Sequence, residues 1–358
     1  MSGSGRDLPG ENVFGHLMAT AIAISVLLAL LAIDLIVRVN YARIVLSTFD
    51  TKPPFNVARV LPDPQAERIS FPSTNGLTLH GSVHRPAHRT ARGVILFCPE
   101  LDGSHWLVTT YCEGLIQAGF VLVAFDFRNQ GESGHLPGYE PNHWLTRYEI
   151  DDAVSALEWI EAHPELSQLP LGVMGVSRGS TAALYVAAHY PHVLAVCCDG
   201  AYSISLLTFH FVSRWASIYM PRWLEPFVPE WHFRSTGAIV RRLSAWRRQC
   251  EYVVIESSLT RLRRCPTLLI AGQRDNYVPM EIGRELVRRM RSPLAKLLVV
   301  PKAKHNRARQ VEPGLYDEAI VEHFEQILPE QTAGSRSSSL VTSSASQRLI
   351  SAESIDAA

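Results

Sequence analysis

The stretch that decides the fold is LGVMGVSRGSTAAL, residues 171–184. Its first six residues are apolar or small, without polar alternation, which is typical of a strand buried on both faces. An alanine-rich helical pattern follows. Ser177 stands at the junction, between Gly175 and Gly179. This pattern predicts a sharp strand-to-helix turn that exposes the Ser177 hydroxyl at the edge of a sheet.

A serine at such a turn suits nucleophilic chemistry. Its hydroxyl is a weak nucleophile, so acyl transfer needs a nearby base to take the proton. The glycines at 175 and 179 supply the lack of bulk that a tight turn requires. The helix that follows aims its N-terminal amides, including that of Arg178, at the place where negative charge develops. A GxSxG sequence is common by chance in loops, but its place between a buried strand and a helix favours a nucleophile.

Strand and helix signals alternate through the middle of the chain. AERISF (66–71) and LTLHGSVHRP (77–86), joined by a turn sequence, predict an antiparallel hairpin. The later strands lack polar alternation and are separated by helical segments, which predicts a mostly parallel, doubly wound sheet covered on both faces. These predicted strands are GVILFC (93–98), FVLVAFDF (120–127), LGVMGVS (171–177), VLAVCCDGA (193–201), TLLIAG (267–272) and KLLVVP (296–301).

Two later residues complete a candidate catalytic set. Asp275 comes just past the strand at 267–272, and His305 lies in the loop after the last strand. Both positions fall on the sheet edge that presents Ser177, so Asp275 would orient the imidazole and His305 would act as general base and then general acid. The alternatives are an acid in a surface turn and an ordinary surface histidine. Thirteen other histidines compete with His305, but none directly follows the final strand.

An oxyanion hole needs a second backbone amide, from the loop after GVILFC. That loop reads Pro99-Glu100-Leu101-Asp102-Gly103-Ser104. By register, the Leu101 amide is the best candidate, with that of Arg178 as its partner. Each such donor contributes a few kcal/mol to lowering the barrier of acyl transfer.

Five motifs together resemble the α/β-hydrolase superfamily of serine hydrolases over about residues 67–328. The resemblance implies an α/β-hydrolase fold, a Ser177–His305–Asp275 triad and ester hydrolysis. It also implies that Asp126, Arg128, Gly131 and Ser133 support the oxyanion loop. The motifs are ILFCPELDGS, AFDFRNQGESG, GVSRGS, IAGQRDNYVP and PKAKHN.

One departure from the family pattern concerns the oxyanion loop. The family usually has His-Gly where this chain has Pro99-Glu100, and that difference could alter access of the acyl group. Arginine after the nucleophile resembles the prolyl-oligopeptidase-like and acyl-CoA-thioesterase-like branches. An N-terminal anchor resembles membrane-tethered lysophospholipase-type and esterase members.

The N-terminal segment from Leu17 to Ile33 carries no charge and is long enough, with its extension to Val37, to span a bilayer. The alternative is a secretory signal peptide, but a small-residue cleavage site does not follow. We therefore expect an uncleaved single-pass anchor. Arg38 and Arg43 flank its downstream end, so the positive-inside tendency favours a cytoplasmic catalytic domain.

The remaining organisation follows from composition. The insertion at 203–264 is rich in aromatic residues, with ten arginines and four glutamates, and is placed to cover the C-terminal edge of the sheet as a lid. The expected units are a polar tail (1–13), a transmembrane anchor helix (14–40), a linker (41–66), an α/β-hydrolase domain (67–330) containing the lid insertion (203–264), and a disordered serine-rich tail (331–358).

Composition also excludes several classes of function. Lysine plus arginine equals aspartate plus glutamate, at 34 each, so nucleic acid is not an expected partner. The six cysteines form no CxxC or zinc-ligand spacing, and unpaired thiols fit a reducing compartment. The sequence contains no HExxH motif and no dinucleotide or phosphate-cradling fingerprint, so we expect no metal and no cofactor.

The predicted activity is hydrolysis of a carboxylic ester, with a lipid or long-acyl substrate favoured by the anchor and the aromatic insertion. A serine peptidase or an acyltransferase on the same fold remains an alternative. So does a non-catalytic, membrane-bound binding protein.

Overall fold

A computed structural model describes most of the chain outside its two ends. Residues 1–8 of the predicted polar tail and most of the predicted serine-rich tail lie outside the described ranges. Those ranges are residues 9–54, 57–87, 90–219, 223, 228–329 and 349–351.

A nine-stranded sheet forms the centre of the described chain, in the order β1-β2-β4-β3-β5-β6-β7-β8-β9. β1 and β2 form the predicted antiparallel hairpin, and β2 pairs antiparallel with β4. The six strands from β3 to β8 are parallel to one another. The strands are β1 (Glu67–Pro72), β2 (Thr78–His84), β3 (Gly93–Cys98), β4 (Phe120–Phe125), β5 (Leu171–Val176), β6 (Val193–Asp199), β7 (Thr267–Gly272), β8 (Ala295–Val300) and β9 (Leu349–Ser351).

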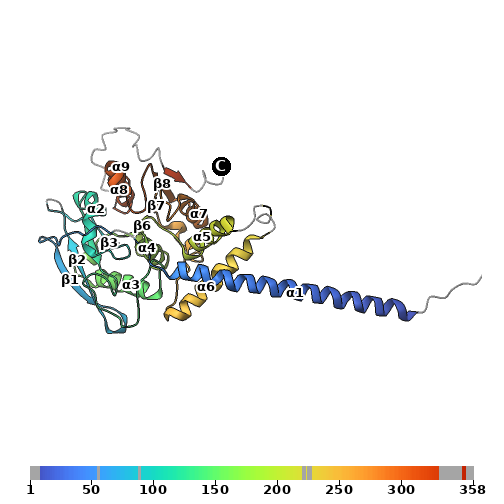
Figure 1. Ribbon diagram of the computed structural model, residues 1–358. Coiled ribbons are helices and arrows are strands. Elements are labelled where there is room, and N and C mark those ends of the chain that lie inside the picture. Colours follow the sequence, from blue (N-terminus) through green and yellow to red (C-terminus); the bar gives the residue numbers. More distant parts are fainter. Residues whose placement is uncertain are drawn as a thin grey trace, which may run out of the picture.

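Helices flank the sheet on both faces (Figure 1). Short 3-10 turns occur at Thr74–Gly76, His105–Leu107, Leu166–Gln168 and Leu259–Arg264. The helices are α1 (Pro9–Asp50), α2 (Val108–Gln117), α3 (Arg147–Ala162), α4 (Arg178–His189), α5 (Ile204–Tyr219), α6 (Glu230–Arg248), α7 (Met280–Met290), α8 (Ala308–Val311) and α9 (Pro313–Glu325).

The core lies on both faces of the sheet, as β3 illustrates. Val94 and Leu96 belong to the core that includes residues of α3, α4 and α7, whereas Ile95 and Phe97 belong to the core that includes residues of α2 and α9. All four side chains are fully buried. A strand with two buried faces needs apolar residues at every position, which explains the absence of alternation in GVILFC. The predicted α/β-hydrolase fold, with its mostly parallel sheet and N-terminal hairpin, is thereby confirmed.

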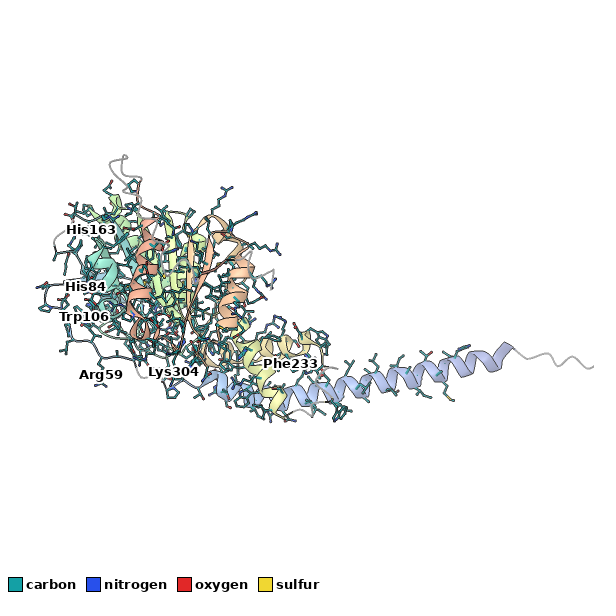
Figure 2. The ribbon with its side chains drawn as sticks, turned by 90° about the horizontal axis from the view of Figure 1, so that it is seen from above. Arg59, His84, Trp106, His163, Phe233 and Lys304 are labelled. Atoms are coloured by element: carbon teal, nitrogen blue, oxygen red, sulfur yellow. The ribbon has the colours of Figure 1, made fainter. Side chains whose placement is uncertain are left out.

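α1 is a single helix of 42 residues that projects from the domain (Figures 1 and 2). The segment Gly15–Asp50 is long and apolar enough to cross a membrane, and its most apolar part buries no side chain in the protein. The helix continues ten residues past the predicted anchor boundary at 40, because Ala42 and Phe49 are buried against the domain. Pro53 and Pro54 follow its end, where neither could continue the helix.

The insertion folds mainly as α5 and α6, and α6 lies alongside the C-terminal half of α1 (Figure 1). Its tip, residues 220–222 and 224–227, is outside the described ranges. One segment of the tail that we predicted to be disordered is ordered: β9 pairs antiparallel with β8. The backbone of β8 offers a free sheet edge, and the short run Leu349–Ser351 pairs with it although it lacks a strong strand pattern of its own.

Candidate active site

Ser177 occupies the predicted turn between β5 and α4. Its backbone has φ +53° and ψ −116°, a conformation that costs a non-glycine residue about 1–3 kcal/mol and must be held by its surroundings. The Ser177 amide donates to the Asp199 carbonyl at 2.8 Å. The Ser180 hydroxyl donates to the carbonyls of Gly175 and Asp199, each at 2.7 Å. These bonds hold the turn and leave the Ser177 hydroxyl at the edge of the sheet.

The two flanking glycines are required by space rather than by backbone angle. A Cβ atom on Gly175 would lie 2.3 Å from the Gly179 carbonyl oxygen. A Cβ atom on Gly179 would lie 2.1 Å from the Cys98 oxygen and 2.5 Å from that of Pro99. The start of α4 therefore packs directly on the backbone that leads into the predicted oxyanion loop.

The structure brings the three predicted catalytic residues together. The Ser177 Oγ lies 3.0 Å from His305 Nε2, and His305 Nδ1 lies 2.7 Å from Asp275 Oδ2. The other carboxylate oxygen, Oδ1, accepts from the amides of Tyr277 and Val278 at 2.8 Å each. This geometry fits an Nδ1–H that donates to the Asp275 carboxylate and an Nε2 that accepts from the serine hydroxyl.

Strand register explains why these distant residues meet. Val176 at the end of β5 is aligned with Asp199 of β6, and Gly272 at the end of β7 is aligned with Val300 of β8. The carboxyl ends of parallel strands face the same edge, which is where open α/β sheets place their sites. The loops after β5, β7 and β8 therefore converge there.

The two amides predicted to form an oxyanion hole are available for a ligand. Neither the Leu101 nor the Arg178 amide has a hydrogen-bond partner within the described residues. The Glu100–Gly103 turn is closed by a 3.0 Å backbone bond, and the Asp102 amide donates to Gln130 Oε1 at 2.7 Å. This arrangement fits the predicted role, and the assignment of Leu101 and Arg178 stays a prediction.

The side chain of Arg178 points away from the reacting groups and is fully buried. It forms a 3.2 Å ion pair with Glu149 of α3 and donates to the Asn142 carbonyl at 3.1 Å. Its guanidinium also lies over the Phe127 ring, at 5.3 Å from the centroid. These contacts fix the first turn of α4, and with it the backbone amide that follows Ser177.

The residues expected to support the oxyanion loop divide into two groups. The Asp126 carboxylate accepts from the amides of His105 at 2.5 Å and Glu132 at 2.7 Å, so it does hold the segment after that loop. Arg128 acts elsewhere: it forms a fully buried ion pair with Asp152 at 2.6 Å. It thus joins the loop after β4 to α3 rather than to the oxyanion loop, because its side chain reaches Asp152 of α3.

Gly131 and Ser133 both contact Asp126. Gly131 has φ +51°, and a Cβ there would lie 2.0 Å from the Asp126 carboxylate. The Ser133 hydroxyl donates to the Asp126 carbonyl at 2.7 Å. Both residues therefore shape the loop around this carboxylate.

Glu100 is a feature that the sequence reasoning missed. Its buried carboxylate accepts from the Tyr111 hydroxyl at 2.8 Å and from the side-chain amide, Nδ2, of Asn306, the residue after His305. Burial raises the pKa of Glu100, and these hydrogen bonds oppose that rise. Glu100 thus ties the predicted oxyanion loop to the histidine loop. The available signal was an acid two residues after the end of an apolar strand.

A second buried acid, Asp199, is the last residue of β6. Its carboxylate accepts from the Tyr316 hydroxyl at 3.1 Å, and burial raises its pKa to about 7. Between about pH 4 and pH 7 the folded protein therefore holds a proton that the unfolded chain has released. The stability that this proton provides is complete below about pH 4 and is lost as the pH rises through about 7.

Asp199→Asn is accordingly expected to flatten the pH dependence of stability. The wild type should lose more free energy of unfolding between pH 5 and pH 8 than the variant, because the amide cannot ionise. Denaturant unfolding of the full chain in detergent, followed by tryptophan fluorescence, measures both slopes. Asp151→Asn, at a partly exposed site on α3, is the control and should keep the wild-type slope. Equal slopes for wild type and Asp199→Asn would contradict the assignment.

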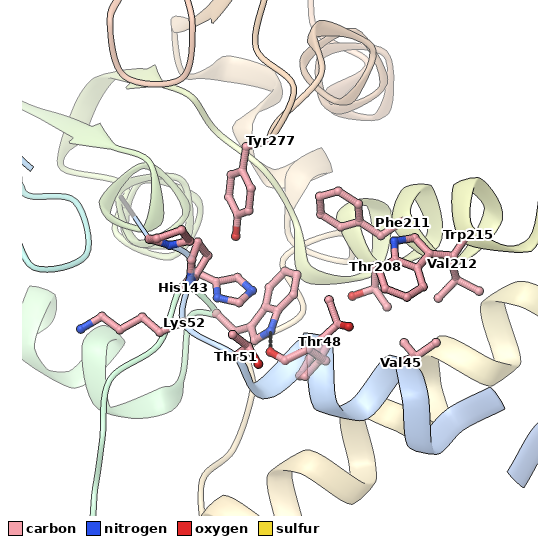
Figure 3. A pocket seen from close by; sticks show the side chains of 14 residues that line it. Val45, Thr48, Thr51, Lys52, His143, Thr208, Phe211, Val212, Trp215 and Tyr277 are labelled. Atoms are coloured by element: carbon pink, nitrogen blue, oxygen red, sulfur yellow. Dashed lines mark hydrogen bonds between the residues drawn. The ribbon is translucent and has the colours of Figure 1, made fainter. Parts of the chain in front are cut away.

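An apolar cavity of about 300 Å³ lies beside Tyr277, whose ring contacts that of His305. Its walls come from the end of α1, from α5, and from His143, Trp144 and Tyr277. Figure 3 shows Tyr277 and His143 at one side, with the α1 and α5 side chains around the rest. The cavity is therefore bounded by a residue two positions after Asp275.

Metal ligation finds no support in the described part of the chain. Within it, no group of three or more histidine, cysteine, aspartate or glutamate side chains is arranged to hold a metal ion.

Comparisons with known proteins agree with the geometry of the fold. Residues 93–227 match the family model described as the alpha/beta hydrolase fold. A search of curated proteins finds no match. Among solved structures, an esterase of Pyrococcus furiosus is similar with a TM-score of 0.56 and 20% identity, covering 78% of this chain and 98% of that one.

Two further solved structures have the same fold. A hypothetical protein from Pseudomonas aeruginosa has a TM-score of 0.53 and 17% identity, covering 77% of this chain and all (100%) of that one. A cold-adapted esterase from an Arctic intertidal metagenomic library has a TM-score of 0.51 and 17% identity, covering 75% and 100%. At these identities the likeness concerns the fold alone.

Proposed function

The chain has the α/β-hydrolase fold, and from this premise we propose that it is a serine hydrolase that cleaves a carboxylic ester. The observation that carries the proposal is the unbroken hydrogen-bonded series from Ser177 through His305 to Asp275. A nucleophile, a base and an orienting acid at these distances are the requirements for acyl transfer. The esterases among the structural neighbours are consistent with it.

In the proposed first half-reaction, Ser177 Oγ attacks the ester carbonyl carbon while His305 Nε2 takes the hydroxyl proton. Asp275 stabilises the imidazolium that results. The carbonyl oxygen becomes an oxyanion and is met by the amides of Leu101 and Arg178. The carbon–oxygen bond to the leaving group then breaks, and the alcohol departs with the proton from His305. An acyl group remains on Ser177.

In the second half-reaction a water molecule replaces the alcohol. His305 takes a proton from the water, the hydroxide attacks the acyl carbon, and the bond to Ser177 Oγ breaks. The serine recovers its proton from His305, and a carboxylic acid leaves. No external oxidant, metal or cofactor enters this scheme.

A lipid or long-acyl ester is the proposed substrate class. The cavity beside Tyr277 is apolar, and α1 is long and apolar enough to anchor the protein in a bilayer. We also propose that the domain lies on the cytoplasmic side, because Arg38 and Arg43 follow the apolar segment.

An epitope placed after residue 358 should therefore be cut by added protease only once cells are opened.

Labelling by a fluorophosphonate probe tests the nucleophile. The full chain in detergent should react, and Ser177→Ala should not, because the probe needs an activated serine oxygen. Ser217→Ala, on the exposed face of α5, is the control and should react like the wild type. Equal labelling of Ser177→Ala would refute the assignment. A folded wild type that neither reacts with the probe nor cleaves any ester would favour a binding protein.

Product analysis separates hydrolysis from the alternatives on this fold. Esters with varied acyl length and head group, together with matched amides, are incubated with and without an alcohol acceptor. The proposal expects free acid from the esters in both conditions. Cleavage of amides alone would indicate a peptidase, and acyl transfer to the alcohol without free acid would indicate an acyltransferase.

A further inference from the structure

The end of α1 forms one wall of the apolar cavity beside the proposed triad. Val45 of α1 faces Phe211 and Trp215 of α5 across it, and Tyr277 closes another side (Figure 3). Phe49 of α1 also lines it. The volume of about 300 Å³ falls within the range of small-molecule sites. A helix that served only as a tether would not be required to line such a cavity.

Tyr277 lies between the cavity and the proposed catalytic residues. The Tyr277 ring contacts the His305 ring edge to face, with centroids 5.2 Å apart. The Tyr277 amide donates to Asp275 Oδ1 at 2.8 Å. His143, which also lines the cavity, has its ring 5.9 Å from that of Tyr277. A ligand filling the cavity would thus contact the Tyr277 ring, whose other neighbour is the His305 imidazole.

Specific contacts hold the end of α1 in place. The Trp144 indole donates from Nε1 to the Phe49 carbonyl at 2.8 Å, and the Phe49 ring stacks on that indole at 4.6 Å. Higher on the helix, the Tyr41 hydroxyl donates to the Val212 carbonyl of α5 at 3.1 Å. These contacts join the anchor helix to both other walls of the cavity.

Further contacts, with α6, hold α1 closer to its exposed apolar part. Arg38 donates to Ser235 of α6 at 2.7 Å, and His232 lies 3.4 Å from Asp34. At 1.5 Å per residue, the twelve residues from Ile33 to Val45 span about 18 Å. Figures 1 and 2 show α6 beside this part of α1, with the rest of the helix running away from the domain. The cavity therefore lies within about 20 Å, along one rigid helix, of the proposed bilayer span.

We propose that the cavity binds the acyl chain of a bilayer lipid and that the last turns of α1 are part of this binding site. The chain would leave the bilayer along α1 and pass between α1 and α5, with its ester group carried to Ser177. This inference rests on the proposed function. It names the residues that bind the acyl chain, and it gives α1 a role in selecting the substrate.

Filling the cavity from its α1 wall tests the proposal. Val45→Trp should lower the ratio of kcat/KM for a palmitoyl ester to that for an acetyl ester at least tenfold, with full-length protein in phosphatidylcholine vesicles. Ile44→Trp is the matched control, since Ile44 neighbours Val45 but is exposed and does not line the cavity. It should keep the wild-type ratio. An unchanged ratio in Val45→Trp would overturn the proposal.

A second pair of variants covers the case in which Val45→Trp fails to fold. Thr48 lines the cavity and is exposed, whereas its neighbour Ser47 is exposed and does not line it. Thr48→Trp should lower the ratio of long to short ester, and Ser47→Trp should not. Equal effects of Thr48→Trp and Ser47→Trp would count against the cavity.

A binding measurement separates this inference from the proposed hydrolysis. Vesicles of phosphatidylcholine carrying a diazirine-labelled stearic acid are illuminated with the full chain, and the cross-linked peptides are mapped. Cross-links on residues 45–54 and 208–215 are expected in the wild type, and their loss is expected in Val45→Trp but not in Ile44→Trp. Absence of these cross-links from an active enzyme would refute the acyl site. Their presence in an inactive one would refute the hydrolase.

Discussion

Replacing His305 by alanine is expected to lower kcat by about 10⁵-fold while the fold is kept. The imidazole lies within hydrogen-bonding distance of Ser177 Oγ, at 3.0 Å, and is placed to act as its base. Without it the serine proton has no acceptor, and the leaving alcohol has no donor. Ser177→Ala should cause a similar loss, and the double variant should be no worse than either single one, because the residues act as a unit.

Steady-state kinetics with an activated ester measure these losses, and circular dichroism checks the fold. His192→Ala is the matched control, since His192 is a partly exposed histidine that pairs with Glu161. It should keep wild-type turnover. Asp275→Asn should lower kcat by about 10⁴-fold, because the amide disfavours the tautomer that the series needs. Turnover of His305→Ala within tenfold of the wild type would show that another group is the base.

Gly179→Ala is the second change with a large expected effect. The added methyl group would lie 2.1 Å from the Cys98 carbonyl oxygen and 2.5 Å from that of Pro99. Both are backbone atoms, so either the start of α4 or the predicted oxyanion loop must move. We expect a loss of at least about 10²-fold in kcat, the effect of one misplaced oxyanion donor. We also expect destabilisation by about 1–3 kcal/mol from overpacking.

The control for this change is another helical glycine. A Cβ on Gly314, near the start of α9, would meet nothing within 4 Å. Gly314→Ala should therefore keep the wild-type kcat and leave the stability equal or slightly higher, because alanine restricts the unfolded chain. Steady-state kinetics measure kcat of both variants, and denaturant unfolding measures their stability. A Gly179→Ala enzyme with wild-type kcat would mean that the oxyanion donors lie elsewhere.

The contacts of Glu100 explain what the sequence Pro99-Glu100, in place of the family's usual His-Gly, does in this protein. Where the resemblance suggested altered access of the acyl group, the Glu100 side chain instead turns inward to Tyr111 and Asn306. It links the loop after β3 to the loop that carries His305. The departure therefore concerns how two loops of the site are held together.

The sequence alone was sufficient for the elements whose signal is local. A strand covered on both faces requires apolar side chains throughout, so GVILFC and TLLIAG could be recognised from their composition. The turn at Ser177 needs glycines on either side, and parallel strands must all end at one edge. Those three constraints place Ser177, Asp275 and His305 at that edge before any coordinates are known.

Only the tertiary structure decided the contacts between segments far apart in the chain. Phe49 packs on Trp144, Arg128 pairs with Asp152, and β9 joins β8, yet none of these pairings leaves a periodic pattern in the sequence. Each depends on how helices, loops and strands close around the sheet. The continuation of α1 to Asp50 has the same origin, since burial of Phe49 against the domain extends a helix that composition alone ended at 40.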